Sequence, residues 1–268
     1  MVYNTGETSE ELKEKYNPEG SLLRKAQMRM FDMLLYLDKV CKELHIDYQL
    51  DGGTVLGAVR HGGFIPWDDD IDVGFERKKW KRLVRYLETH PHPQYKIQTH
   101  RTDPGYMGAW AVLRDTKSEY IVNSKEHNIR KYRGVQVDLF PFDQGNVFLL
   151  QRAAVQLDEK LIRFWFDKSL FVARLGYNLC YRLIFPIFRL FNVFGKKKFL
   201  SHSYGTTAFR LMRPLDVMLP AKELVFEGVT FMGPAKPKEY LKNMYGDYMS
   251  LPPIEQRNHH RAECKIWD

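Results

Sequence analysis

Four carboxylates fall within five consecutive positions of this chain: Asp68, Asp69, Asp70 and Asp72. Negative charges this close repel one another strongly inside a fold unless a cation is present. An exposed acidic loop would be the simple alternative, but acid and apolar residues alternate in Asp70-Ile71-Asp72-Val73. In a strand, the two acids would project from one face while Ile71 and Val73 enter the core. The stretch therefore predicts a strand with an acidic site on one side.

The composition is that of a globular protein. The chain has 268 residues, of which 44% are apolar and 28% charged, and 41 Lys and Arg against 33 Asp and Glu give a formal charge of +8. These values exclude intrinsic disorder over most of the length. The three cysteines are far apart, and the first twenty residues are polar and acidic. We therefore expect a cytoplasmic protein with reduced thiols, without a signal peptide or an N-terminal anchor.

Hydrophobic periodicity predicts a mixture of helices and strands. Apolar residues recur every three to four positions over 22–44, with Ser21 as the N-cap, and a second helix is expected over 77–88. Strands are expected over 47–50, 71–75, 96–99, 109–113 and 135–140. A hairpin (224–226 and 229–232) and a short helix from Pro237 to Gly246 follow. This order indicates an α+β or α/β fold.

The carboxylates suggest a metal site. Two carboxylates on one strand face suit Mg²⁺, which takes one or two protein carboxylates and completes its shell with water and phosphate; Mn²⁺ is the alternative. An EF-hand is excluded, because counting from Asp68 the sixth residue is Val73 and the twelfth is Lys79. Residues 135–139 also alternate and place Asp138 opposite the apolar side. If the two strands are neighbours, Asp70, Asp72 and Asp138 form one catalytic, metal-binding cluster.

A glycine turn supplies the other half of a phosphoryl-transfer site. Gly52-Gly53-Thr54 precedes the apolar run 55–59. Glycines let the backbone approach a phosphate closely, and a helix beginning at Thr54 would direct its positive end at that phosphate. The glycine turn and the short helix supply backbone N–H groups for a phosphate, and the Asp-x-Asp strand supplies carboxylates for a metal ion. The combination is therefore more specific than any of its parts.

The segment 160–200 differs in kind from the rest of the chain. It holds eleven aromatic residues, nine Lys or Arg and one acid, Asp167. On a helical wheel its polar residues share one stripe, and Pro186 is expected to bend or break the helix. Two interpretations stay open: core helices with a solvated basic face, or a segment lying on an anionic membrane surface.

The motifs together resemble the LicD family of phosphotransferases, which is related to the fukutin proteins and has the nucleotidyltransferase fold. The resemblance rests on LDGGTVLGAVRHGGFIPWDDDIDVGF (50–75), VDLFPFD (137–143), FEGVTFMGP (226–234) and EYLKNMYGDYMSLPP (239–253). It implies a nucleotidyltransferase-like mixed sheet flanked by helices. It also implies transfer of phosphocholine, or a similar phospho-alcohol, from CDP-choline or a related CDP-alcohol to a sugar hydroxyl, with release of CMP. The acceptor would belong to a cell-surface glycan, such as lipopolysaccharide or teichoic acid, or to its lipid-linked precursor.

The resemblance also assigns roles to the motif residues. Asp70 and Asp72 match the Asp-x-Asp pair, and Asp138 the third acidic position, as either a ligand to a second ion or the base that receives the acceptor proton. Gly52, Gly53 and Thr54 match the phosphate-holding turn. Further candidate substrate-binding residues are Arg60 as a diphosphate clamp, Trp67 as an aromatic wall for choline, and Asp51 and Asp69 beside the substrate. Surface or core positions are the alternatives for each of them.

We expect four parts along the chain: a polar segment (1–20), the catalytic core (21–150), a basic aromatic helical insert (151–215) and a C-terminal hairpin, helix and tail (216–268). Two other functions stay open. One is nucleotidyl transfer to a sugar or another small acceptor with release of pyrophosphate. The other is a non-enzymatic basic protein that binds membranes. No nucleic-acid-reading motif is visible, so we expect no nucleic-acid partner, and we expect any membrane contact at the inner face of the cell membrane.

Overall fold

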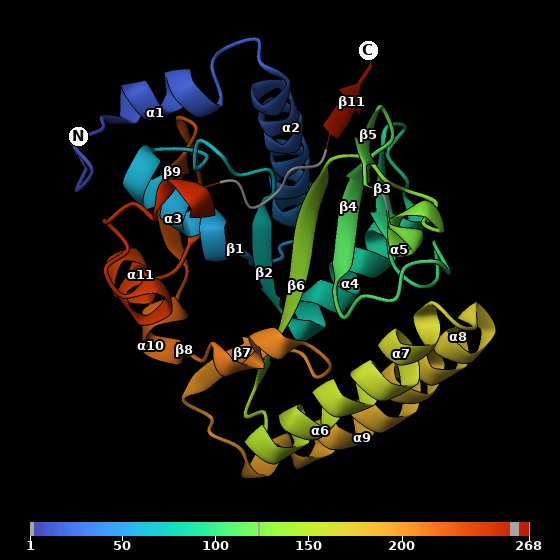
Figure 1. The fold of residues 1–268 in the computed structure, drawn as a ribbon. Coiled ribbons are helices and arrows are strands. Elements are labelled where there is room, and N and C mark those ends of the chain that lie inside the picture. The colour runs from blue at the N-terminus through green and yellow to red at the C-terminus, as the bar shows by residue number, and fades with distance from the viewer. Residues whose placement is uncertain (1–2, 123, 258–262, 268) are drawn as a thin grey trace.

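A mixed β-sheet lies at the centre of the computed structural model, which describes residues 3–122, 124–257 and 263–267 (Figure 1). The strand order is β1-β2-β6-β4-β3, and β7 and β8 extend the sheet from β6. Only the β2–β6 pair among these is parallel. The strands are β1 (Gln49–Leu50), β2 (Asp72–Glu76), β3 (Tyr95–Gln98), β4 (Ala111–Asp115), β6 (Gln136–Gln144), β7 (Phe199–His202) and β8 (Arg213–Pro214).

Two smaller sheets lie beside the main one. In one, β5 (Ser118–Ile121) pairs with β11 (Glu263–Ile266), and in the other, β9 (Lys222–Phe226) pairs with β10 (Val229–Gly233). The second pair is the hairpin predicted from the sequence. The mixed sheet flanked by helices confirms the expected fold class.

Helices cover the sheet and its edges. They are α1 (Ser9–Tyr16), α2 (Leu22–Glu43), α3 (Gly52–His61), α4 (Arg77–Thr89), α5 (Lys125–Asn128), α10 (Leu215–Met218) and α11 (Pro237–Tyr245), with 3₁₀ turns at Thr207–Arg210 and Ile254–Gln256. The long helix α2 begins where expected, because the Ser21 side chain accepts a hydrogen bond from the Arg24 N–H. Both α2 and α4 contact the sheet and bury their apolar sides against it.

The short helix after β1 begins earlier than predicted. The sequence suggested a start at Thr54, but α3 starts at Gly52, with Asp51 as its N-cap. The Asp51 N–H donates to the Asp72 carbonyl, so strand pairing ends at Asp51 and the chain must turn at once. Gly52 makes that turn with a φ of +53°, which is easily adopted only by glycine.

Two antiparallel helical arms form a layer below the sheet (Figure 1). The first arm is α6 (Phe148–Asp158), a π-helical turn (Glu159–Arg163) and α7 (Phe164–Phe166). The second is α8 (Leu170–Leu179), a π-helical turn (Cys180–Ile184), α9 (Phe185–Leu190) and a 3₁₀ turn (Phe191–Phe194). We call residues 148–194 the helical insert. It packs around a second small core, to which Met107 and Tyr204 contribute from outside the insert and Ala154, Ile162, Phe166, Ala173, Cys180 and Phe185 from within it.

The helix that was expected to bend or break at Pro186 is distorted just before this residue, at a π-helical turn, but it is not broken. The chain reverses direction at 167–169 instead, and helical structure continues from 170 through Pro186. The π-helical turn directly precedes this proline, which occupies the first turn of α9, where its missing N–H is tolerated. The widened turn thus accommodates the proline without breaking the arm.

The polar stripe of the helical insert faces the rest of the protein. Arg163 pairs with Asp158 and Glu126, the Arg174 Nε donates to the Pro104 carbonyl, and Asn192 donates to the Asn146 side chain. Part of this stripe is therefore engaged by the protein, although Arg174, Arg182 and Lys196 stay exposed to solvent. No helix within the described residues combines the length and the apolar character needed to cross a membrane.

Candidate active site

The parallel pairing of β2 with β6 brings two of the predicted acids together. Asp72 and Asp138 are directly paired in register, and the Asp138 N–H donates to the Ile71 carbonyl at 2.8 Å. Neighbouring strands lie about 4.8 Å apart, and paired residues project on the same face. Val73 and Leu139 point the other way and are fully buried in the core. For Asp72 and Val73, and for Asp138 and Leu139, the alternation thus corresponds to two sides of one sheet, whereas Asp70 precedes β2 and is not on a strand face.

The acids at this position repel one another. Burial, followed by the charge of Asp70, raises the pKa of Asp138 to about 7, while nearby Arg114 opposes the shift. Burial and then the charges of Asp70 and Asp138 raise the pKa of Asp72 well above its usual value. Asp68 has a raised pKa for the same reasons, burial first and Asp70 second. A bound cation would remove this cost, because it favours the charged forms.

The glycine turn lies directly against these carboxylates. A Cβ at Gly52 would lie 2.5 Å from Oδ2 of Asp72, and one at Gly53 would lie 3.0 Å from Oδ2 of Asp68. The Thr54 hydroxyl oxygen accepts a hydrogen bond from the Asp72 N–H at 2.8 Å. Thr54 therefore fixes the first turn of α3 on β2, which brings the N-terminus of the helix beside the acids.

A buried ion pair between Asp51 and Arg213 holds the residue that precedes the glycine turn. Arg213 donates from Nε and Nη2 to the two carboxylate oxygens of Asp51, at 3.0 and 2.7 Å. The Tyr240 hydroxyl also donates to Asp51 and accepts a hydrogen bond from the Gly52 N–H. Burial alone would raise the pKa of Asp51, but Arg213 and His202 outweigh it and hold that pKa well below the usual value. The carboxylate of Asp51 is thus already hydrogen-bonded to side chains of the protein.

The donor set has the chemistry of a magnesium site, although three ligands are not preassembled. No group of three or more His, Cys, Asp or Glu side chains in the described part of the chain is arranged to hold a metal ion. Oxygen donors nevertheless face one another across β2 and β6, and buried Oδ1 of Asp138 has no hydrogen-bond partner among the described residues. Since Mg²⁺ commonly takes only one or two protein carboxylates, the residues present fit that ion.

Comparison with known proteins agrees with this arrangement. The nucleotidyltransferase domain described as LicD/FKTN/FKRP matches residues 45–171, which include the glycine turn and the acids of β2 and β6. Over 91% of its length the chain is 30% identical to the lipopolysaccharide cholinephosphotransferase LicD of Haemophilus influenzae, and the match covers 98% of that protein. The chain belongs to the LicD family. This identity supports the broad prediction of a phosphotransferase.

A shorter match links this LicD-family chain to mammalian proteins. Over 39 residues it is 49% identical to the ribitol 5-phosphate transferase FKRP of human and of mouse. The match covers 15% of this chain and 8% of those proteins. It therefore concerns a local motif and not the whole architecture.

Three of the predicted substrate-binding residues have other partners in this LicD-family structure. Arg60 is buried, and its Nη1 donates to the Tyr248 and Ser250 carbonyls at 2.9 and 3.2 Å. Trp67 is 7% exposed and packs between the ring of Tyr16 and the guanidinium of Arg257. The diphosphate clamp and the choline wall expected of Arg60 and Trp67 are therefore not formed by their side chains here.

The third residue, Asp69, is buried, and its backbone carbonyl accepts a hydrogen bond from the Tyr120 hydroxyl at 3.0 Å. Arg257, whose guanidinium lies over the Trp67 ring, is fully buried and donates to the Glu7 carboxylate. These contacts make the acidic loop a packed wall of the site.

Several residues around the acids were missed by sequence reasoning. Arg213 and Tyr240 lie 162 and 189 positions from Asp51. No motif marks the segment of Arg213, and the 239–253 motif that contains Tyr240 suggested no role for it in the site. Arg114 is buried near Asp138 and held by the Gln98 side chain and the Gly134 carbonyl. The Gln136 side chain donates to Oδ2 of Asp138 at 3.1 Å. The alternation of β4 would have placed Arg114 on the acidic face once the strand order was known.

Removing the Asp51 charge should destabilise the protein. In Asp51→Asn the guanidinium of Arg213 loses its buried counter-ion, so we expect unfolding to become about 3–5 kcal/mol easier at pH 7. Because the pKa of Asp51 is lowered by folding, its contribution is present above its unfolded pKa of about 3.9 and is lost as the pH falls further. Urea denaturation measures this, with Asp47→Asn, a mostly exposed site, as the control. An Asp51→Asn/Arg213→Met double variant should recover part of the loss, and equal stability of Asp51→Asn and wild type would contradict the assignment.

The charged carboxylate of Asp138 should destabilise the folded protein, whereas that of Asp51 stabilises it. Its raised pKa means that the folded state binds more protons than the unfolded state between about pH 4 and 7, so stability falls as the pH rises through this range. Without divalent cations, Asp138→Asn should therefore melt above the wild type at pH 8, with the difference shrinking at pH 5. Thermal melts in EDTA test this, and a variant less stable than wild type at pH 8 would refute it.

Proposed function

We propose that this protein transfers phosphocholine, or a similar phospho-alcohol, from a CDP-linked donor to a sugar hydroxyl of a cell-surface glycan or its lipid-linked precursor, with release of CMP. One observation carries the proposal. Asp72 and Asp138 are paired in register beneath the Gly52-Gly53 turn, so carboxylates for a cation and a helix N-terminus for a diphosphate meet at one point. The relatives, a cholinephosphotransferase and a ribitol 5-phosphate transferase, support a phospho-alcohol as the transferred group.

Each part of the site has a role in this reaction. Asp70 and Asp72 would hold Mg²⁺, or Mn²⁺ in its place, and the ion would neutralise the donor diphosphate and the leaving CMP. The turn at Gly52 and Gly53 leaves room for phosphate oxygens, and the positive end of α3 attracts them. The acceptor hydroxyl attacks the phosphorus that bears the alcohol, and the bond from that phosphorus to the CMP oxygen breaks.

Asp138 accepts the proton of the attacking hydroxyl in this proposal. Its Oδ1 is buried without a hydrogen-bond partner among the described residues, while Oδ2 is held by Gln136. This leaves one carboxylate oxygen for the substrate. Arg114 and Gln136 would then act as positioning residues for Asp138.

Product analysis tests the activity. We expect metal-dependent CMP release when the protein is incubated with a glycan acceptor and a panel of CDP-alcohols. Asp72→Asn should lower kcat about 10²–10⁴-fold because it weakens the electrostatic stabilisation, and Asp138→Asn should lower it by a similar factor because it removes the base. Asp47→Asn is the matched control and should keep full activity. Release of pyrophosphate from a nucleoside triphosphate, without CMP release from any CDP-alcohol, would establish nucleotidyl transfer instead.

We also propose that the protein docks on an anionic membrane through the helical insert. Its second arm turns a continuous apolar stripe to solvent, spaced by three or four residues: Phe171, Leu175, Leu179, Leu183, Ile187, Leu190 and Phe194. Phe171 and Phe194, at its two ends, are 77% and 80% exposed. On the other side of the same arm, Arg174 donates to the Pro104 carbonyl and Asn192 to the Asn146 side chain. This is the reverse of a helix that packs on a water-soluble core, and an apolar phase is the natural cover for such a face.

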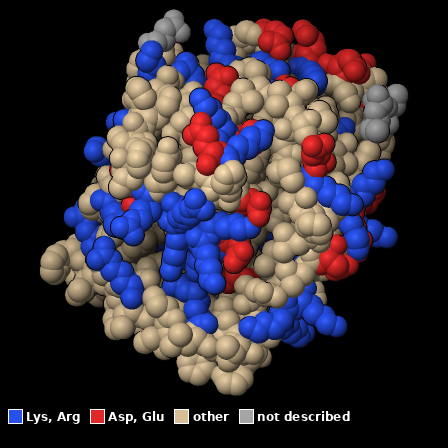
Figure 2. Space-filling model, turned by 180° about the vertical axis from the view of Figure 1, so that it is seen from behind, with Lys and Arg blue, Asp and Glu red and all other residues tan. Residues whose placement is uncertain are grey.

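The charges around the stripe favour an anionic lipid surface as that cover. Lys168 precedes Phe171, and Lys196, Lys197 and Lys198 follow Phe194, all with exposed side chains. Lysines that flank an apolar helix face can reach anionic headgroups while the apolar side chains enter the acyl boundary. Figure 2 shows the largely uncharged lower surface, where the insert lies, beneath a band of Lys and Arg. Such docking would bring the site to lipid-linked acceptors at the inner face of the cell membrane.

Vesicle flotation tests the docking surface. Wild-type protein should float with phosphatidylglycerol-containing vesicles and less with phosphatidylcholine vesicles, and Leu175→Gln/Leu183→Gln should reduce flotation without lowering the melting temperature. The control Leu22→Gln/Ile254→Gln changes two similarly exposed apolar residues outside the insert. Wild type that stays in the soluble fraction would refute the proposal, as would a stripe variant that floats like wild type. If the stripe variant instead converts a dimeric wild-type protein to monomers, a second copy of the chain covers this face.

A further inference from the structure

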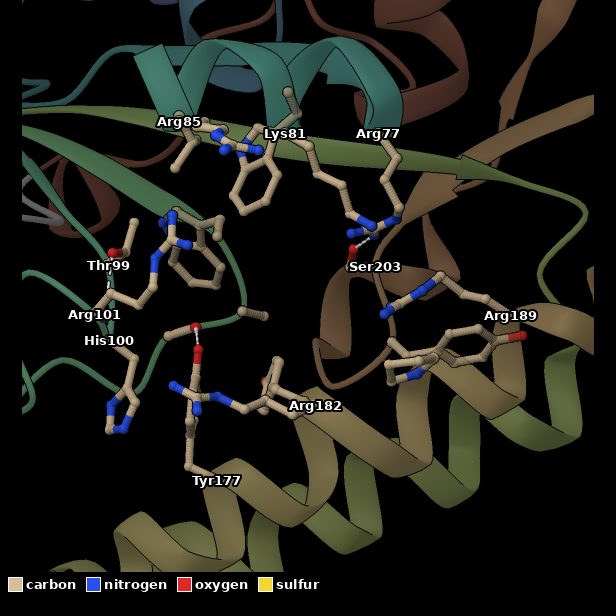
Figure 3. A pocket seen from close by; sticks show the side chains of 18 of the residues that line it. Arg77, Lys81, Arg85, Thr99, His100, Arg101, Tyr177, Arg182, Arg189 and Ser203 are labelled. Atoms are coloured by element: carbon tan, nitrogen blue, oxygen red, sulfur yellow. Dashed lines mark hydrogen bonds between the residues drawn. The ribbon is translucent and has the colours of Figure 1, made fainter. Parts of the chain in front are cut away.

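A basic pocket of about 700 Å³ lies between the sheet and the helical insert (Figure 3). Its walls come from α4, from the loop between β3 and β4 and from the second arm of the insert. Trp80, Trp110, Tyr177 and Tyr181 form much of its apolar lining. Its cationic side chains are Arg77, Lys81, Arg85, Arg101, Arg182 and Arg189. The size is that of a small-molecule site, and it exceeds what a single inorganic ion fills.

The positive charge of this pocket is only partly compensated. Arg77 pairs with Asp143, and Arg101 pairs with Glu88. The other four cations, Lys81, Arg85, Arg182 and Arg189, have no carboxylate at ion-pair distance among the described residues. Six cations against two acids leave a net charge of +4 around the pocket.

These cations also repel one another. Burial, followed by the charge of Arg77, lowers the pKa of Arg189 to about 10. Burial, then Arg77 and Arg189, lowers the pKa of Lys81. Figure 3 shows Arg77, Lys81, Arg182 and Arg189 extending from opposite walls toward the same space. Like charges held this way cost free energy, and a multivalent anion between them would reverse the sign of that interaction.

The donor chemistry of the pocket suits a phosphate ester. Guanidinium groups bind phosphate oxygens in pairs of parallel hydrogen bonds, and several of them converge here with the Ser203 hydroxyl nearby. The aromatic walls suit a sugar ring or an apolar chain attached to that phosphate. The sole lining acid, Glu88, is paired with Arg101, so no unpaired carboxylate among the described lining residues would repel an anion.

The pocket adjoins the candidate active site without being part of it. Trp110 lines the pocket, and its indole lies close enough to Asp138 to lower the pKa of that carboxyl. From Asp138, β6 runs four residues to Phe142, beside the Asp143 that pairs with Arg77, which is about 13 Å along a strand. The glycine turn proposed for the donor diphosphate lies at the start of β2, next to Asp72, whereas Arg77 of the pocket follows the end of this strand.

We propose that this pocket binds a phosphate or diphosphate ester carried by the acceptor, on its sugar or on its lipid. The inference rests on the proposed function for the identity of the ligand as acceptor, but the anion site itself stands on the pocket. An acceptor anchored there would present its hydroxyl along the direction of β6 toward Asp138. The apolar outer face of the insert would hold the pocket close to the membrane from which a lipid-linked acceptor is drawn.

Direct binding of inorganic pyrophosphate tests the anion site. Calorimetric titration in EDTA, where Mg²⁺ cannot hold the probe at the acidic cluster, should show binding by wild type that weakens steeply with added salt. Arg182→Gln/Arg189→Gln should weaken it at least tenfold. Arg82→Gln/Lys25→Gln, which changes exposed cations away from the pocket, should bind like wild type. No binding by wild type, or equal binding by the pocket variant, would overturn the proposal.

The melting temperature distinguishes a ligand-binding role of Arg182 and Arg189 from a structural role. Since Arg182 and Arg189 make no hydrogen bond or ion pair with described side chains, the pocket variant should melt at or above the wild-type temperature. A lower melting temperature together with unchanged pyrophosphate affinity would mean that these arginines serve packing, and would overturn the proposal.

Competition and kinetics identify the bearer of the phosphate. Displacement of pyrophosphate by glucose 6-phosphate would assign the ester to a sugar, and displacement by phosphatidylglycerol vesicles would assign it to a lipid headgroup; either result supports the site. In the CMP-release assay, the pocket variant should raise KM for the acceptor tenfold or more and leave KM for the CDP-alcohol unchanged. Pyrophosphate binding that depends on the pocket in a protein without CMP release would retain the anion site and reject the proposed activity alone.

Discussion

The site depends on the parallel pairing of β2 with β6. This single register sets Asp72 beside Asp138 and turns Val73 and Leu139 into the core. A shift by one residue would exchange the two faces, burying the acids in the hydrophobic core and exposing the apolar residues. The same strand receives the Asp51 N–H at the Asp72 carbonyl, so the glycine turn is fixed relative to the acids by backbone hydrogen bonds.

The cluster is costly for the folded chain, and its surroundings are built to hold it. Burial and mutual repulsion raise the pKa values of Asp68, Asp72 and Asp138, which disfavours their charged forms. Around them, the held guanidinium of Arg114 supplies positive charge in a fixed position, and Arg213 neutralises the nearby charge of Asp51. Such repulsion between buried carboxylates is expected at a binding site where a bound cation or substrate balances their charge.

The helical insert inverts the usual distribution of polar and apolar side chains. Its second arm directs Arg182 and Arg189 into the basic pocket, and the apolar stripe from Phe171 to Phe194 faces outward. This orientation gives one structural reason for two surfaces, an apolar face for a membrane and a cationic pocket for an anion. The location of the pocket between the insert and β6 places the second surface next to Asp138.

Local patterns determined much of this protein from sequence alone. Apolar periodicity predicted α2 and α4, and the alternation around Asp72 and Asp138 predicted two strands with acids on one face, because these patterns depend on residues a few positions apart. The same holds for the glycine turn, apart from the start of α3. Tertiary structure alone decided that Arg213 and Tyr240 hold Asp51, that Trp67 and Arg60 are buried in packed walls, and that the polar stripe of the insert faces inward. A helical pattern shows that two faces differ, but which face meets the protein depends on the charges and shapes of segments far away in the chain.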